Sequence, residues 1–215
     1  MAILFDAVTD RVTLATPIDF TSTYKLSFWF NLQNARGNVL QIISTTASSD
    51  NNFDTVGIVF NSVPLCFYTE CQGGAGQPYG YSSNDVVATI GTWFYVELIR
   101  ASTTSLQLYV NDTLAGSLTT NVSARGTLPV GTTTQIGGWD TINNYVNGII
   151  ANVQIHTTTA RNTTHRNVFR PRLFTGLNGW LPLYNVDTLN DYSGNGKNGS
   201  ASGSLTTASN PPIVY

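Results

Sequence analysis

Residues 25–32 read Lys-Leu-Ser-Phe-Trp-Phe-Asn-Leu, a stretch in which apolar and polar side chains alternate. A period of two is typical of a β-strand that buries one face, because successive side chains of a strand point to opposite sides. We therefore predict a strand whose buried face carries four large apolar side chains: Leu26, Phe28, Phe30 and Leu32.

The same alternation recurs along the chain, in residues 56–60, 93–100, 106–110 and 149–155. The short link at 101–105 predicts that two of these strands form a hairpin. In the last stretch we expect Ile149, Ala151, Val153 and Ile155 to share one face. At least eight short strands, separated by Gly, Asn, Ser and Pro turns, predict an all-β fold: a two-sheet antiparallel sandwich.

Composition supports this fold class and excludes others. The chain has 215 residues, a formal net charge of −2, 41% hydrophobic residues and only 10% charged ones. Such a chain can bury a core, but it lacks the basic excess that nucleic-acid binding needs. Glu and Lys, which cover the surfaces of helical proteins, occur only twice each. At most one short helical turn is expected, in residues 159–170 before Pro171.

The chain is predicted to be a single domain over residues 1–215, because no repeat or long linker divides it. A tail rich in Gly, Ser, Asn and Thr starts at about residue 193 and is expected to be loop or weakly ordered strand. The first residues lack the pattern of a signal peptide, and no stretch approaches a membrane span. We expect no export signal and no membrane insertion.

Seven short motifs follow one another in an order that resembles a known family. They are Phe-Asp-Ala-Val-Thr-Asp-Arg-Val at 5–12, Leu-Ser-Phe-Trp-Phe at 26–30, Gly-Thr-Trp-Phe-Tyr-Val at 91–96, Leu-Tyr-Val-Asn-Asp at 108–112, Gln-Ile-Gly-Gly at 135–138, Asn-Gly-Ile-Ile-Ala-Asn-Val-Gln-Ile at 147–155 and Asp-Tyr-Ser-Gly-Asn-Gly-Lys-Asn-Gly at 191–199. In residue type and order they are similar to motifs of the concanavalin A-like lectin/glucanase superfamily, in its laminin G-like branch.

This resemblance implies a jelly-roll sandwich with one concave and one convex sheet. The chain departs from the family pattern at three positions: Ala151 and Asn152 stand where acidic residues are common, and Tyr95 stands where His is usual. These departures weaken the case for a calcium or polar site carried over from the family.

Two cysteines, Cys66 and Cys71, are separated by four residues. They either face each other across a short hairpin loop and form a disulfide, or remain two buried thiols. Two soft ligands without a second Cys/His pair do not make a zinc site.

Enzymatic chemistry is poorly supported. Glycoside hydrolases need two carboxyl groups flanking one bond, and the only glutamates are Glu70 and Glu97. Glu97 shares a predicted strand face with Trp93 and Tyr95, but we interpret it as a surface residue. His156 and His165 have no nucleophile motif beside them and are interpreted as surface histidines. We predict a non-enzymatic protein.

Two segments offer aromatic rings and amides of the kind that bind sugars. The first is the Gly-rich loop with Tyr79 and Tyr81, and the second runs from 139 to 145. The predicted glycan-binding residues of the second segment are Trp139, Asp140, Asn143, Asn144 and Tyr145. The alternative is that these aromatic side chains cover the core ends or line a protein interface.

Oxygen-bearing side chains crowd together at Asp187, Asn190, Asp191 and Asn195, but their spacing is not that of a calcium loop. Asx turns explain such clusters more simply. We predict no metal and no cofactor.

Positive charge is concentrated in one stretch. No acidic residue lies between Asp140 and Asp187, whereas that interval holds Arg161, Arg166, Arg170 and Arg172. Either these arginines decorate a solvated turn, or they form a docking patch for an acidic protein partner.

The resemblance extends to stand-alone laminin G-like proteins of bacteriophages. It implies a structural or binding module on a virion surface, as a capsid decoration (cement) or fibre component made in the host cytoplasm. Low Lys and Glu content suits a surface that packs into an assembly, since fewer long side chains must be ordered. We expect a homo-oligomer with protein partners. A carbohydrate-binding lectin-type module is the alternative, and a glycoside hydrolase is a distant one.

Overall fold

The structure is a computed structural model. It describes the chain except for residues 19–22, 36–38, 47–51, 61–64, 74–78, 103, 120–131, 139–144, 160, 162–175 and 212–215.

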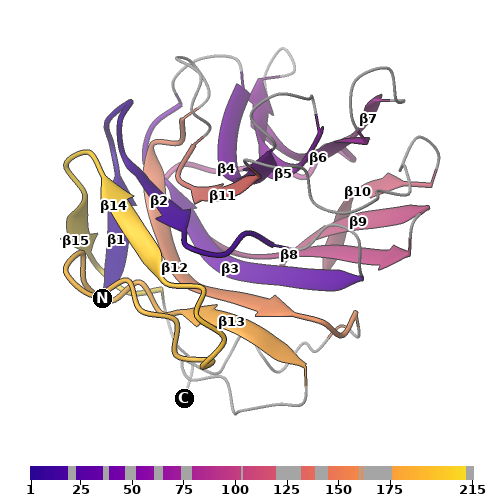
Figure 1. Cartoon of the computed structure of the whole chain (residues 1–215). Helices are drawn as coiled ribbons and strands as arrows, with labels where there is room; N and C mark the ends of the chain where they lie inside the picture. Colours follow the sequence, from indigo (N-terminus) through magenta and orange to yellow (C-terminus); the bar gives the residue numbers. More distant parts are fainter. Residues whose placement is uncertain are drawn as a thin grey trace.

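Two antiparallel sheets form the molecule (Figure 1). The first sheet has the order β10-β9-β8-β3-β12-β1-β15, and β13 also pairs with β12. Its strands are β1 (Ala2–Phe5), β3 (Tyr24–Leu32), β8 (Trp93–Ser102), β9 (Ser105–Val110), β10 (Thr113–Leu118), β12 (Gly148–His156), β13 (Leu177–Leu181) and β15 (Thr206–Ala208).

The second sheet has the order β14-β2-β11-β4-β5-β6-β7. Its strands are β2 (Arg11–Leu14), β4 (Val39–Thr46), β5 (Asn52–Phe60), β6 (Leu65–Gly73), β7 (Tyr79–Ser82), β11 (Thr133–Ile136) and β14 (Gly199–Ser202). The predicted all-β, two-sheet antiparallel sandwich is confirmed, and no helix occurs in the described residues. The predicted helical turn lies almost wholly outside them.

The core lies between the sheets and is built as the alternation predicts. Leu26, Phe28, Phe30 and Leu32 of β3 are all buried in the main apolar cluster. Phe67 of the opposite sheet packs edge-on against Phe30 and Phe94, with ring centroids 6.3 and 5.1 Å away. The described residues contain no helix long and apolar enough to span a membrane.

A β-bulge changes the expected faces of β12. The pairing of β12 with β3 shifts between Ala151 and Gln154, and Asn152 has a φ of 53°. The extra residue reverses the alternation, so Ile150, Val153 and Ile155 face the core. Our expectation that Ile149 and Ala151 share that face was wrong, because no regular period anticipates a bulge.

The tail from residue 193 contains β14 and β15, the edge strands of the two sheets. Cys66 and Cys71 both lie in β6, five residues apart, and point to opposite faces of the strand. They are buried thiols and form no disulfide, so the second of the two alternatives holds.

One row of paired side chains crosses the outer face of the first sheet. Tyr109 pairs with Glu97, Glu97 with Ser27, Ser27 with Gln154, and Gln154 with Trp180. Paired residues of antiparallel strands lie on the same face. The row therefore joins two features of this face: a charged cluster at Glu97 and an aromatic cleft at Trp180.

Candidate functional site

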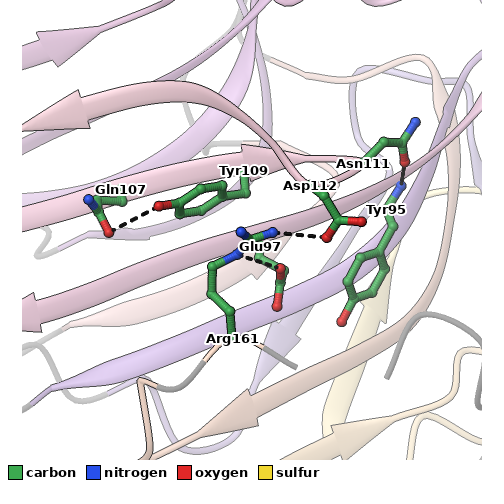
Figure 2. Close-up of polar contacts among 7 residues, drawn as sticks. All are labelled: Tyr95, Glu97, Gln107, Tyr109, Asn111, Asp112 and Arg161. Atoms are coloured by element: carbon green, nitrogen blue, oxygen red, sulfur yellow. Dashed lines mark hydrogen bonds and ion pairs between the residues drawn. The ribbon is translucent and has the colours of Figure 1, made fainter. Parts of the chain in front are cut away.

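The charged cluster gathers around Arg161, which lies beyond the end of β12 (Figure 2). Its Nη2 donates to Asp112 Oδ1 at 2.9 Å, and its Nε donates to Glu97 Oε2 at 3.4 Å. The guanidinium also lies over the Tyr109 ring, 3.8 Å from its centroid. Two consecutive strands and the turn that follows them thus hold a cation that lies 49 and 64 residues further along the chain than Asp112 and Glu97.

The turn between β9 and β10 presents Asp112 to this cation. Asn111 and Asp112 have φ values of 46° and 69°, the left-handed pair that a tight hairpin turn requires. Asn111 Oδ1 accepts a hydrogen bond from Tyr95 N at 2.8 Å, which fastens the turn to β8 (Figure 2). The acidic side of the cluster therefore rests on β8 and on a turn that is hydrogen-bonded to it.

Glu97 is enclosed, with 1% of its surface exposed. Burial raises the pKa of Glu97, while the charges of Lys25 and Arg161 act in the opposite direction. Burial also lowers the pKa of Lys25, which is itself buried. Our interpretation of Glu97 as a surface residue was wrong, because the sequence does not show which segment covers the sheet.

The geometry of the cluster favours a structural role over catalysis. One guanidinium bridges Glu97 and Asp112, so the two carboxylates do not flank a glycosidic bond from opposite sides as hydrolysis requires. His156 was also interpreted as a surface residue, and this too was wrong. It is 2% exposed, and its Nε2 lies 3.1 Å from Gln154 Oε1. His165 lies outside the described residues.

The second feature is an open aromatic cleft of about 290 Å³. It is lined by Trp180, Pro182, Tyr184 and Tyr192. The rings of Trp180 and Tyr192 are tilted by 57° with centroids 5.7 Å apart. Tyr192 is 52% exposed, so its ring is accessible from solvent.

Local alternation explains three walls of the cleft. In residues 180–184, Leu181 and Leu183 are buried in the core, so Trp180, Pro182 and Tyr184 turn the other way. Leu183 has a φ of 56°, a strained value for a bulky residue that is found mainly at functional sites.

The bulge of β12 fixes the orientation of Trp180. Trp180 Nε1 donates to Asn152 Oδ1 at 2.9 Å, and Asn152 is the bulge residue with positive φ. Bulges commonly re-aim a side chain beside a site. The indole N–H is therefore used inside the protein, and the ring is what Trp180 offers to a ligand.

The loop of oxygen-bearing residues supplies the fourth wall, Tyr192. Asp191 accepts hydrogen bonds from Trp180 N, Ser193 N, Ser193 Oγ and Lys197 N at 2.8 to 3.0 Å. Burial favours a higher pKa for Asp191, but these donors together lower it. An Asx-turn role for this carboxylate is confirmed. The described residues contain no group of three or more His, Cys, Asp or Glu side chains placed to hold a metal.

The cleft differs from the predicted sugar sites. Tyr79 and Tyr81 belong to β7, but their side chains lie outside the described residues, as do Trp139, Asp140, Asn143 and Asn144. Tyr145 is half-buried and forms bridges with Gly138 and Gln41. Those predictions stay untested. The signal that could have marked the cleft is the alternation Trp-Leu-Pro-Leu-Tyr at 180–184, from which no site was predicted.

The structure describes one residue of the predicted arginine patch. Arg161 pairs with Glu97 and Asp112 within the chain, its side chain is 29% exposed, and its contact with a partner stays a prediction. Arg166, Arg170 and Arg172 lie outside the described residues and remain a prediction.

Comparison with known proteins agrees with the architecture. A family model described as "Concanavalin A-like lectin/glucanases superfamily" matches residues 6–164. No curated protein matches the chain.

Three solved structures show the same fold at low sequence identity. A heptameric SAP-like pentraxin of Limulus polyphemus has a TM-score of 0.62 at 15% identity, with 95% of this chain and 93% of that one covered. A proposed carbohydrate-binding protein of Bacteroides ovatus has a TM-score of 0.65 at 15% identity, with 99% and 61% covered. The active domain of tailspike protein 2 of bacteriophage CBA120 has a TM-score of 0.60 at 12% identity, with 79% and 28% covered.

Proposed function

Because the chain belongs to the concanavalin A-like lectin/glucanase superfamily, we propose that it is a non-enzymatic, carbohydrate-binding module. The observation that carries the proposal is the aromatic cleft of Trp180, Pro182, Tyr184 and Tyr192. It is a concave, mainly apolar site with a few polar atoms, the usual form of a small-ligand site.

Sugar rings match this cleft in their chemistry. One face of a pyranose presents C–H bonds with partial positive charge, and the faces of Trp and Tyr rings are negative. Tyr192 adds a hydroxyl that both donates and accepts hydrogen bonds, as sugar hydroxyls require. The cleft therefore provides stacking surface and polar contacts together.

A proline-rich peptide fits the same aromatic composition less well. Such peptides bind aromatic grooves, and their free carbonyl groups need donors from the groove. Trp180 has already donated its indole N–H to Asn152 Oδ1 at 2.9 Å. A sugar stacks on the face of the Trp180 ring and does not need this N–H, so the use of the indole donor favours carbohydrate. The likeness to the proposed carbohydrate-binding protein of Bacteroides ovatus supports the same choice.

A glycan array tests the proposal. We expect the unsubstituted chain to bind a defined set of oligosaccharides without cleaving them, and Tyr192→Ala to abolish binding. Ile90→Ala is the matched control, because Ile90 has the same exposed fraction of 52% and is not part of the cleft. Clean negatives on a broad array, or equal loss in both variants, would refute carbohydrate binding at this cleft.

We further propose that the module is displayed on a virion surface as a decoration or fibre component. The likeness to a phage tailspike domain and the scarcity of Lys and Glu support this placement. Antibodies raised against the purified chain should label intact phage particles from the source lysate. Labelling confined to the particle-free fraction would contradict it.

A further inference from the structure

Asp191 is the most heavily hydrogen-bonded carboxylate beside the cleft. Its Oδ1 accepts from Trp180 N at 2.8 Å and Ser193 N at 2.9 Å. Its Oδ2 accepts from Ser193 Oγ at 2.9 Å and Lys197 N at 3.0 Å. A half-buried carboxylate with four donors is fixed in place, and so is the loop that closes around it.

The same carboxylate connects the two aromatic walls of the cleft. Trp180 N donates to Asp191 Oδ1, and Tyr192 N donates back to Trp180 O at 2.9 Å. The second bond joins the backbones of Tyr192 and Trp180, and the first joins Trp180 to the side chain of the residue that precedes Tyr192. The two ring centroids lie 5.7 Å apart in this arrangement.

Packing in the apolar core does not explain the position of Tyr192. The side chain is 52% exposed and is not part of the apolar core cluster. An exposed ring ordinarily samples several rotamers and loses that freedom on binding. What restrains Tyr192 here is the backbone held by Asp191, with Gly194 and Gly196 at φ of 85° and 72° allowing the loop to turn.

We propose that Asp191 is the positioning residue of the carbohydrate cleft: it holds Tyr192 against Trp180 and so preforms the site. The nature of the ligand in this inference rests on the proposed function, whereas the arrangement of the two rings does not. A preformed aromatic cleft binds more tightly because less conformational entropy is lost on binding. Both carboxylate oxygens of Asp191 accept hydrogen bonds from N–H and O–H donors, and these bonds hold the loop in position.

The position of the loop also depends on pH in a defined direction. The titratable groups flanking Asp191 are Lys197, whose Nζ donates to Pro17 O at 3.2 Å, the phenols of Tyr184 and Tyr192, and Asp187 on the same loop. The pKa of Asp191 lies below its ordinary value of 3.8. The tether is therefore complete above pH 3.8 and is lost as the pH falls through the lowered pKa.

The test is the nuclear Overhauser contact between the Trp180 and Tyr192 rings, which needs no ligand. We expect the contact in the unsubstituted chain at pH 3.8 and above, and its loss only as the pH falls through the lowered pKa of Asp191. Asp191→Ala should abolish it at neutral pH, and Asp191→Asn should restore it in part, because the amide keeps one acceptor oxygen. Asn195→Ala is the control, since it removes only bonds to Ser193 and Leu177.

The same variants are then tested on the array glycan with the strongest signal. Asp191→Ala should weaken binding by about tenfold, and Asn195→Ala should leave it within about twofold. A ring contact that survives in folded Asp191→Ala overturns the inference. If Asp191→Ala does not fold, the acid titration of the unsubstituted chain decides. An array without binding, together with a ring contact that follows Asp191, would contradict the proposed function and leave the positioning role standing.

Discussion

Glu97 carries a carboxylate that the fold buries and pairs with a cation. Its carboxylate is buried, its Oε1 has no hydrogen-bond partner, and its Oε2 is bound to Arg161. A buried charge is costly unless it is paired, so Arg161 offsets part of the cost of keeping Glu97 ionised. The residue is structural.

Glu97→Gln therefore changes stability in a pH-dependent way. Burial raises the pKa of Glu97 above its ordinary 4.5, so the folded chain binds this proton more tightly than the unfolded chain does. The contribution of Glu97 to stability is full below pH 4.5 and is lost as the pH rises through the folded pKa. Urea denaturation of both proteins should show the unsubstituted chain losing stability relative to Glu97→Gln as the pH rises. A relative gain would contradict the assignment.

Arg161→Ala removes the guanidinium that pairs with the carboxylates of Glu97 and Asp112. We expect a loss of about 2 kcal/mol in the free energy of unfolding, less than for a fully buried pair because Arg161 is 29% exposed. Glu97→Gln in the same chain should recover part of that loss, because the buried charge is then gone. Strict additivity of the two substitutions in urea denaturation would show that Glu97 and Arg161 do not interact.

At the scale of the element, the bulge in β12 has the largest effect on the site. It turns Ile150 into the core and sets Asn152 beneath the indole of Trp180. Asn152 N also donates to Pro182 O at 3.0 Å, which holds a second wall of the cleft beside that indole. One extra residue in one strand thus positions two walls of the cleft.

Asn152→Ala tests this element directly. The substitution removes the acceptor of the indole N–H and puts Ala at a φ of 53°, which together should cost about 1–3 kcal/mol. Asn152→Gly keeps the backbone conformation and removes only the hydrogen bond, so it should cost less. Thermal unfolding of both variants gives the comparison. Equal loss would mean that the backbone conformation of Asn152 matters little.

Elements were predictable from sequence where the signal is local. The strands that contain 26–32, 94–98 and 106–110 follow a period of two, and a period is visible in a single chain. The bulge was not predictable, because it depends on pairing with β3. The burial of Glu97 was missed for a similar reason, since its partner Arg161 lies 64 residues away.

In the whole molecule, the charged cluster at Glu97 and the aromatic cleft at Trp180 lie on the same outer sheet face but are built from different segments. Arg161 fastens the chain beyond β12 to the hairpin of β9 and β10, whereas the cleft unites β13 with the loop that carries Tyr192. Chain topology brings them onto one face, and no local pattern encodes that. The sandwich was predictable from motif order. Of the cleft, the alternation at 180–184 was visible in the sequence, whereas the position of Tyr192 beside Trp180 was not.

Self-association is a prediction at this scale. The proposed place on a virion surface requires an assembly, so light scattering of the purified chain at several concentrations should give a stable oligomer. A strict monomer at all concentrations would count against the virion placement and would leave the carbohydrate cleft unaffected.

Binding of a sugar against Trp180 can be followed through the indole N–H resonances of the four tryptophans. Titration with the array glycan that gives the strongest signal should shift the Trp180 resonance, assigned from Trp180→Phe, and leave those of Trp29 and Trp93 in place. A shift at Trp139 with none at Trp180 would place the sugar in the 139–145 segment and refute binding at the cleft.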